Sequence, residues 1–236
     1  RQSQDSDVVA ITNATLIDGS GRTPLSDSVV VFKGDRITAV GGRDKVKIPA
    51  NARIIDAKGM VVAPGFIDTH NHSDRGLFEE PTAATQVSQG ITTISIGQDG
   101  GSPFPIGEYF AKLEREPAAL NVLTFVGHAT VRAKVMGDNT NRHATTEEIE
   151  KMKALVDQGM RDGAFGLSSG LEYEVGKPST TEELIALATV AGRYHGIYIS
   201  HVRDEADKVF DAFNELIRIS REGKLPAQVS HIKLGT

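Results

Sequence analysis

The feature that most constrains the fold is the alternation, after residue 60, of short apolar segments with amphipathic ones. Two amphipathic segments open with the pattern TTEE, at 145–148 and 180–183, which is typical of a helix capping box. A third, 205–222, has apolar residues at helical spacing and ends at Gly223. Strands that alternate with helices in this way predict a parallel sheet. The predicted strands are 61–68, 91–97, 121–128, 164–170, 196–202 and 227–235.

The polar residues at the ends of these strands favour one kind of parallel sheet. No Gly-rich phosphate-binding pattern follows the first strand, as an open nucleotide-binding sheet would have. Instead, ligand-type side chains follow one predicted strand after another, as they do at the active-site face of a (β/α)8 TIM-type barrel. Such a barrel needs about 250 residues. We therefore expect this chain to hold strands one to six, with the rest in a C-terminal remainder of the same protein.

The first part of the chain predicts a separate small β module. Residues 8–56 contain short segments of alternating apolar and polar residues, separated by turn signals such as Lys33-Gly34-Asp35. We predict two domains. Residues 1–58 form the N-terminal part of a small β-sandwich, and residues 59–236 form the first part of the barrel.

Composition excludes several classes of protein. The net charge is −5 and no basic stripe is present, so a nucleic-acid partner is not expected. No apolar run approaches the roughly 18 residues of a membrane span. Cysteine is absent, which excludes disulfides and thiolate chemistry within this chain. The chain begins with RQSQDSD rather than Met, so we expect a removed tag or signal peptide, and a cytoplasmic location or, with a signal peptide, a periplasmic one.

Five of the seven histidines fall at the ends of predicted strands. His70 and His72 follow the first strand in the segment GFIDTHNHSD, and two positions along a strand share a face. Single histidines follow strands three, five and six, at His128, His201 and His231. Because parallel strands of a barrel end at the same face, we expect these side chains to meet there.

The chemistry of this set points to a metal. Neutral imidazoles and a carboxylate, here Asp99 after strand two, suit zinc, and catalytic zinc sites keep one position open for water. Zinc lowers the pKa of bound water to about 7 and can polarise a carbonyl. The pattern therefore predicts metal-dependent hydrolysis of an amide or an ester.

Longer stretches of the chain resemble one family. They are similar to the D-aminoacylase (N-acyl-D-amino-acid deacylase) family of the amidohydrolase superfamily, from about Val8 onward. The resemblance implies an enzyme that hydrolyses N-acyl-D-amino acids with one or two zinc ions. The stretches are APGFIDTHNHSD, GITTISIGQDGGS, GHATVR, GAFGLSSGLEYEVG, SHVRDE and SHIKLG.

The resemblance also implies a set of metal ligands. His70 and His72 would bind one metal position, and His201 and His231 would bind the other, which is the tighter in this family. Family members usually carry a bridging Cys where this chain has Asp99. A carboxylate can bridge two cations, and because it is a harder ligand than thiolate it would also admit manganese or cobalt. The alternative for Asp99 is a turn residue that caps its own backbone.

Substrate contacts are implied in the same way. Tyr173 would steady the substrate carbonyl or the tetrahedral oxyanion, and so has a catalytic role. Lys233 would pair with the free carboxylate of the substrate. Apart from the resemblance, we expect His128, at the end of the third predicted strand, to line the pocket. The general base of this family, an Asp at the end of strand eight, is expected beyond residue 236.

Two other functions stay open on the sequence alone. A dipeptidase or a cyclic-amide hydrolase of the same superfamily would use the same ligands, and Lys233 favours a substrate with a free carboxylate, such as an N-acyl amino acid or a dipeptide. A non-catalytic amidohydrolase-like binding protein is disfavoured because the ligands are present.

Overall fold

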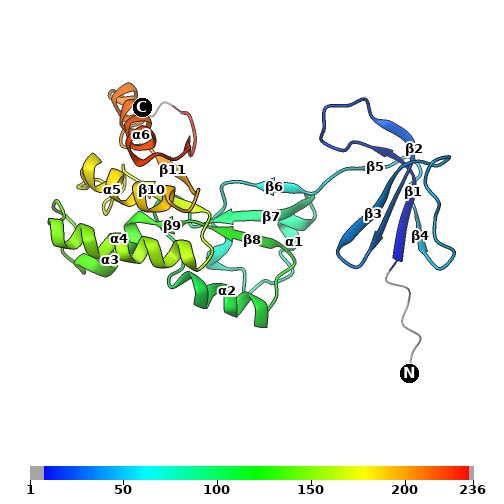
Figure 1. The fold of residues 1–236 in the computed structure, drawn as a ribbon, viewed down its shortest axis with the longest axis horizontal. Coiled ribbons are helices and arrows are strands. Elements are labelled where there is room, and N and C mark those ends of the chain that lie inside the picture. Colours follow the sequence, from blue (N-terminus) through cyan, green and yellow to red (C-terminus); the bar gives the residue numbers. More distant parts are fainter. Residues whose placement is uncertain (1–7, 234–236) are drawn as a thin grey trace. The chain divides into compact units, whose positions relative to one another are not determined.

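The computed structural model describes residues 8–233, which fall into two compact units (Figure 1). The two units meet in the sequence between Gly65 and Phe66. The division lies a few residues beyond the predicted boundary at 58/59, because strand β5 (Val61–Val62) still pairs with the first strand of the N-terminal sheet. The predicted strand over 61–68 is therefore two strands, one in each unit.

The N-terminal unit is one mixed sheet with the order β3-β2-β1-β4, and β5 also pairs with β1. The turn at Gly34, whose φ is +57°, joins two antiparallel strands and confirms the predicted hairpin. Ala10, Val29 and Val31 form its core. Within residues 8–233, this sheet forms one layer of the predicted two-layer β-sandwich. The first four strands are β1 (Val8–Leu16), β2 (Leu25–Lys33), β3 (Arg36–Gly42) and β4 (Arg53–Asp56).

The second unit contains parallel strands that follow one another in chain order. They form two sheets, β6-β7-β8 and β12-β11-β10-β9. The predicted strand at 121–128 is divided at Phe125, whose amide donates to Ile96 O at 3.2 Å. The amide of Phe165 donates to Thr124 O at 2.8 Å, so hydrogen bonding continues across the division. The strands are β6 (Phe66–Asp68), β7 (Ile91–Ile96), β8 (Asn121–Thr124), β9 (Val126–Gly127), β10 (Gly166–Gly170), β11 (Ile197–His201) and β12 (Ala227–Val229).

The helices of the second unit pack against its strands and bury its main core. This core includes Met152, Leu187, Tyr198 and Ile219. None of the helices among residues 8–233 combines the length and the apolar composition that a membrane crossing requires. The helices are η1 (Ser73–Arg75), α1 (Ala84–Val87), α2 (Ile106–Arg115), α3 (His128–Met136), α4 (Thr146–Arg161), α5 (Thr181–Gly192) and α6 (Val209–Gly223).

Helix α6 begins later than predicted, at Val209 rather than at residue 205. The side chain of Asp204 accepts hydrogen bonds from the amides of Ala206 and Lys208, both at 2.9 Å. These bonds hold the preceding residues in a turn. The predicted stop at Gly223 is confirmed, and Lys224 follows it in a left-handed conformation.

The two TTEE segments have different outcomes. The capping box at Thr145 is complete, as predicted. At the second segment, Thr180 accepts from the amide of Glu183 at 3.1 Å, but the Glu183 side chain turns into the interior. It accepts two hydrogen bonds of 2.6 Å from Arg132 and lies 2.8 Å from Nε2 of His128. A buried charged network therefore joins α3 to α5 in place of the predicted capping box.

This network predicts a large stability effect. All three side chains are buried, so removing one partner leaves an unpaired buried charge. We expect Arg132→Met to lower the free energy of unfolding of the full-length protein by about 3–5 kcal/mol in urea titrations. The control is Arg218→Met, which breaks exposed ion pairs and should cost no more than about 1 kcal/mol. Equal losses in the two variants would contradict this account.

The same network predicts a pH dependence. Burial raises the pKa of Glu183, but hydrogen bonds from His128 and Arg132 outweigh burial and lower it overall. A carboxyl group whose pKa is lower in the folded state than in the unfolded state stabilises the fold at pH values above its unfolded pKa. This stabilisation is lost as the pH falls through the folded-state pKa. The difference in unfolding free energy between wild type and Glu183→Gln should therefore shrink below the usual glutamate pKa of 4.5.

Candidate metal centre

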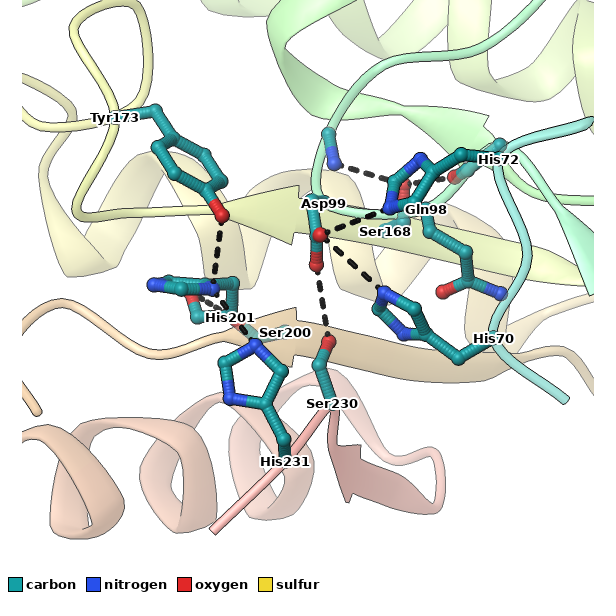
Figure 2. Close-up of polar contacts among 12 residues, drawn as sticks. His70, His72, Gln98, Asp99, Ser168, Tyr173, Ser200, His201, Ser230 and His231 are labelled. Atoms are coloured by element: carbon teal, nitrogen blue, oxygen red, sulfur yellow. Dashed lines mark hydrogen bonds and ion pairs between the residues drawn. The ribbon is translucent and has the colours of Figure 1, made fainter. Parts of the chain in front are cut away.

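Among residues 8–233, six possible metal ligands gather in two groups near the ends of the parallel strands. Figure 2 labels all of them except Glu205. Within each group, one ligand atom from every residue lies within 4.8 Å of the others. The sequence predicted five of these residues and missed Glu205. The first group is His70, His72 and Asp99, and the second group is His201, Glu205 and His231.

The two histidines of the first group lie in a turn after β6, not within the strand. Asp68 accepts from the amide of His70 at 3.2 Å and from Nδ2 of Asn71 at 2.7 Å. The amide of Asn71 donates to Ser95 O at 2.9 Å, which ties the turn to β7. The rings of His70 and His72 lie edge to face, with centroids 5.2 Å apart. The turn, rather than strand alternation, brings the two imidazoles together.

Asp99, the third member of the first group, lies in the turn after β7. Its φ is +54°, a left-handed conformation that Asp tolerates better than most residues. Its Oδ2 is 3.3 Å from Nε2 of both His70 and His72. Its Oδ1 accepts a hydrogen bond of 3.3 Å from Ser230, the residue before His231. The carboxylate therefore faces the histidines and Ser230 rather than its own backbone.

The turn that carries Asp99 is held from two sides. Ser168 of β10 donates to Gly97 O at 2.5 Å and accepts from the amide of Gly100 at 3.2 Å. Gln98 is almost fully buried and donates to Thr69 O at 3.1 Å. The loops after β6 and β7 are thus fixed to each other and to strand β10, which preorganises the first group.

In the second group, two imidazoles face each other. His201 ends β11 and is only 3% exposed, and its Nδ1 is 3.0 Å from Nε2 of His231 (Figure 2). We call these the inner nitrogens. Each outer nitrogen has a carboxylate behind it: Glu172 lies 2.8 Å from Nε2 of His201, and Glu205 lies 2.7 Å from Nδ1 of His231. Carboxylates behind metal-ligating histidines commonly fix the ring and its tautomer.

The donor sets fit divalent transition-metal ions. Imidazole nitrogens and carboxylate oxygens are the ligands that zinc and its neighbours prefer. Within the part of the chain that the structure describes, Nδ1 of His70 is buried without a hydrogen-bond partner, and such an atom calls for an explanation such as a bound ion. The rings of His70 and His231 have centroids 6.1 Å apart, so the two groups are adjacent.

Two of the three predicted substrate-binding residues, Tyr173 and Lys233, lie beside the second group. The hydroxyl of Tyr173 is 3.1 Å from the inner nitrogen of His201. Burial, and next the Asp99 carboxylate, raise the pKa of this hydroxyl, so it stays protonated and can donate a hydrogen bond. Nζ of Lys233 is 3.0 Å from Glu205, whose hydrogen bond raises the pKa of the lysine.

The structure does not bring His128 to this site, which corrects the prediction that it lines the substrate pocket. Helix α3 begins at His128 and directs its imidazole into the interior, where it is fully buried against Glu183. Its neighbours Ala129 and Thr130 line the cavity instead.

A cavity of about 1140 Å³ opens beside the first group. His72, Asp99 and Tyr173 contribute to its wall, together with Phe78 and Lys112. The ammonium of Lys112 lies 3.8 Å from the centre of the Phe78 ring. The volume is ample for a small substrate.

The chain belongs to the amidohydrolase family, because the model of that family matches residues 53–235. It is 37% identical to a D-aminoacylase of Alcaligenes xylosoxydans xylosoxydans, over 95% of this chain and 50% of the relative. It is 38% identical to an N-acyl-D-aspartate deacylase of the same organism, over 95% of this chain and 49% of the relative. The chain thus spans about half the length of these curated relatives.

Solved structures agree. A crystal structure of D-aminoacylase matches with a TM-score of 0.88 and 34% identity, over 97% of this chain and 52% of that one. An N-acyl-D-glutamate deacylase from Bordetella bronchiseptica, complexed with zinc and a phosphonate mimic of the tetrahedral intermediate, matches with a TM-score of 0.86 and 32% identity. That match covers 95% of this chain and 51% of the other. These matches confirm the predicted amidohydrolase barrel fold.

The packing at Gly170 gives a test of this geometry. A Cβ atom at this position would lie 2.4 Å from Asp99 O and 2.4 Å from Cδ2 of Tyr173. Gly170→Ala must therefore displace the turn of Asp99 or the ring of Tyr173. We expect zinc affinity of the full-length protein, measured against a chromogenic chelator, to fall by about tenfold. Gly76→Ala, which enters open space, should stay within about twofold; a similar loss there would contradict the account.

Proposed function

We propose that the protein containing this chain hydrolyses the amide bond of N-acyl-D-amino acids and releases a carboxylate and a D-amino acid. The observation that carries the proposal is the meeting of three groups: the inner nitrogens of His201 and His231, and the hydroxyl of Tyr173. The similarity to D-aminoacylase and to two deacylases of N-acyl-D-amino acids supports this substrate class.

The metal assignment follows from the two groups. His70, His72 and Asp99 would hold one ion, and His201 and His231 would hold the other, with zinc as the favoured metal. A bound ion supplies a water of lowered pKa and polarises the scissile carbonyl. One oxygen of Asp99 lies 3.3 Å from both histidines of the first group, and the other accepts a hydrogen bond from Ser230, the residue before His231. Because a carboxylate replaces the family's Cys, manganese or cobalt should also be accepted.

The chain's own side chains would position the substrate. Tyr173 donates a hydrogen bond to the oxygen that becomes negative as the amide is attacked, and such a donor is most effective when it is already in place. Lys233 pairs with the free carboxylate and so fixes which end of the substrate faces the ligands. The general base, an Asp implied by the family resemblance, would come from the C-terminal remainder.

The function is tested with the full-length protein. Release of free amino acid is measured from N-acetyl-D- and N-acetyl-L-amino acids, before and after treatment with a chelator. We expect D-selective release that the chelator abolishes and zinc restores. No release of either enantiomer by metal-loaded protein would contradict the proposal and direct attention to dipeptides and cyclic amides.

Recognition of the carboxylate is tested at Lys233. Hydrogen bonds to charged groups contribute about 1.5–3 kcal/mol, so Lys233→Ala should raise KM by about 10- to 100-fold with a smaller change in kcat. Lys151→Ala, on the exposed surface of α4, is the control and should leave both constants unchanged. An unchanged KM in Lys233→Ala would show that the carboxylate is bound elsewhere.

A further inference from the structure

Glu205 touches both the metal ligands and the substrate-binding lysine, and its side chain is buried, with 5% of the residue exposed. We propose that Glu205 is a positioning residue that holds His231 for metal binding and Lys233 for the substrate carboxylate. The inference rests on the proposed function, which it deepens by linking metal binding to substrate recognition through one side chain.

The first oxygen of Glu205 serves His231. Oε1 lies 2.7 Å from the outer nitrogen, Nδ1, in an ion-pair contact, and within residues 8–233 neither of these buried atoms has a hydrogen-bond partner. A carboxylate at this nitrogen favours the tautomer with the proton on Nδ1. The lone pair of Nε2 is then left on the inner side, facing His201 at 3.0 Å. Glu205 thus sets which nitrogen of His231 is available to a metal.

The second oxygen of Glu205 serves Lys233. Oε2 lies 3.0 Å from Nζ, whose side chain is otherwise 54% exposed. An ammonium group has three donors, so one bond to Glu205 leaves two for a substrate carboxylate. Without this contact the long side chain would sample many rotamers in water, and substrate binding would have to order it.

The neighbours of Glu205 fix it in place. Asp204 caps the amides of Ala206 and Lys208, and Arg203 forms an ion pair of 2.8 Å with Glu215 of α6. The segment between β11 and α6 is therefore anchored on both sides of Glu205. A buried carboxylate also needs partners of opposite charge or hydrogen-bond donors, and His231 and Lys233 are placed to supply both.

Direct metal ligation by Glu205 is the competing interpretation. Its Oε2 lies 3.6 Å from Nε2 of His201, which is the outer nitrogen of that ring, and its Oε1 is at the outer nitrogen of His231. Both contacts are therefore on the side away from the inner pair. This placement favours a role for Glu205 in orienting the two histidines over a role as a metal ligand.

The experiment uses Glu205→Gln in the full-length protein. We expect zinc affinity, measured by competition with a chromogenic chelator, to fall about 10- to 100-fold, as for other partners of metal-ligating histidines. We expect KM for an N-acetyl-D-amino acid to rise about fivefold or more, because the weaker bond to the neutral amide lets Lys233 move. Asp204→Asn removes the same charge one residue away, keeps an oxygen for capping, and should change neither quantity.

A Lys233→Met background separates the two roles. There, Glu205→Gln should still weaken zinc binding by the same factor but should no longer raise KM. Zinc affinity and KM within twofold of wild type in Glu205→Gln, or equal changes in Asp204→Asn, would overturn the proposal. If Glu205→Gln does not fold, Glu205→Asp gives the same test, since the shorter side chain cannot reach both partners.

Failure of the proposed function gives a different result. A protein that binds zinc but hydrolyses no N-acyl amino acid would disprove the deacylase activity. The zinc affinities of wild type, Glu205→Gln and Asp204→Asn would still decide whether Glu205 orients His231.

Discussion

Parallel pairing of strands in chain order is the constraint on which the rest of the structure depends. The register of β10 and β11 places Gly170 opposite His201, and that of β11 and β12 places Ser200 opposite Val229. Strands paired in this way end at one face, so residues far apart in the sequence meet there. The backbone hydrogen bonds therefore supply the rigidity, and the loops after the strands supply the ligands.

Much of the fold could be predicted because strand and helix patterns are local properties of the sequence. The details that failed depend on tertiary contacts. The apolar run at 121–128 gives no sign of the division at Phe125. The segments 145–148 and 180–183 have the same letters, yet only the second has Arg132 and His128 nearby to draw its glutamate inward. Composition and periodicity do not report such partners.

The candidate site was predictable where a ligand directly follows a strand. Asp99, His201 and His231 were found by that rule. Glu205 was missed because it lies in the segment after β11, whose shape depends on the Asp204 turn. His128 also follows a strand, but the prediction for it was wrong, because a helix begins at that residue and directs the imidazole inward. A position just after a strand therefore predicts that a residue belongs to the site only when the conformation of the following turn is known.

The central claim is that the two groups of side chains are metal positions, and anomalous X-ray scattering at the zinc edge tests it most directly. Crystals of the zinc-loaded full-length protein should show ions about 2.0–2.2 Å from their ligand atoms. One ion is expected at the inner nitrogens of His201 and His231, and another among His70, His72 and Asp99. Zinc absent from both groups, or bound only at other surface residues, would contradict the account.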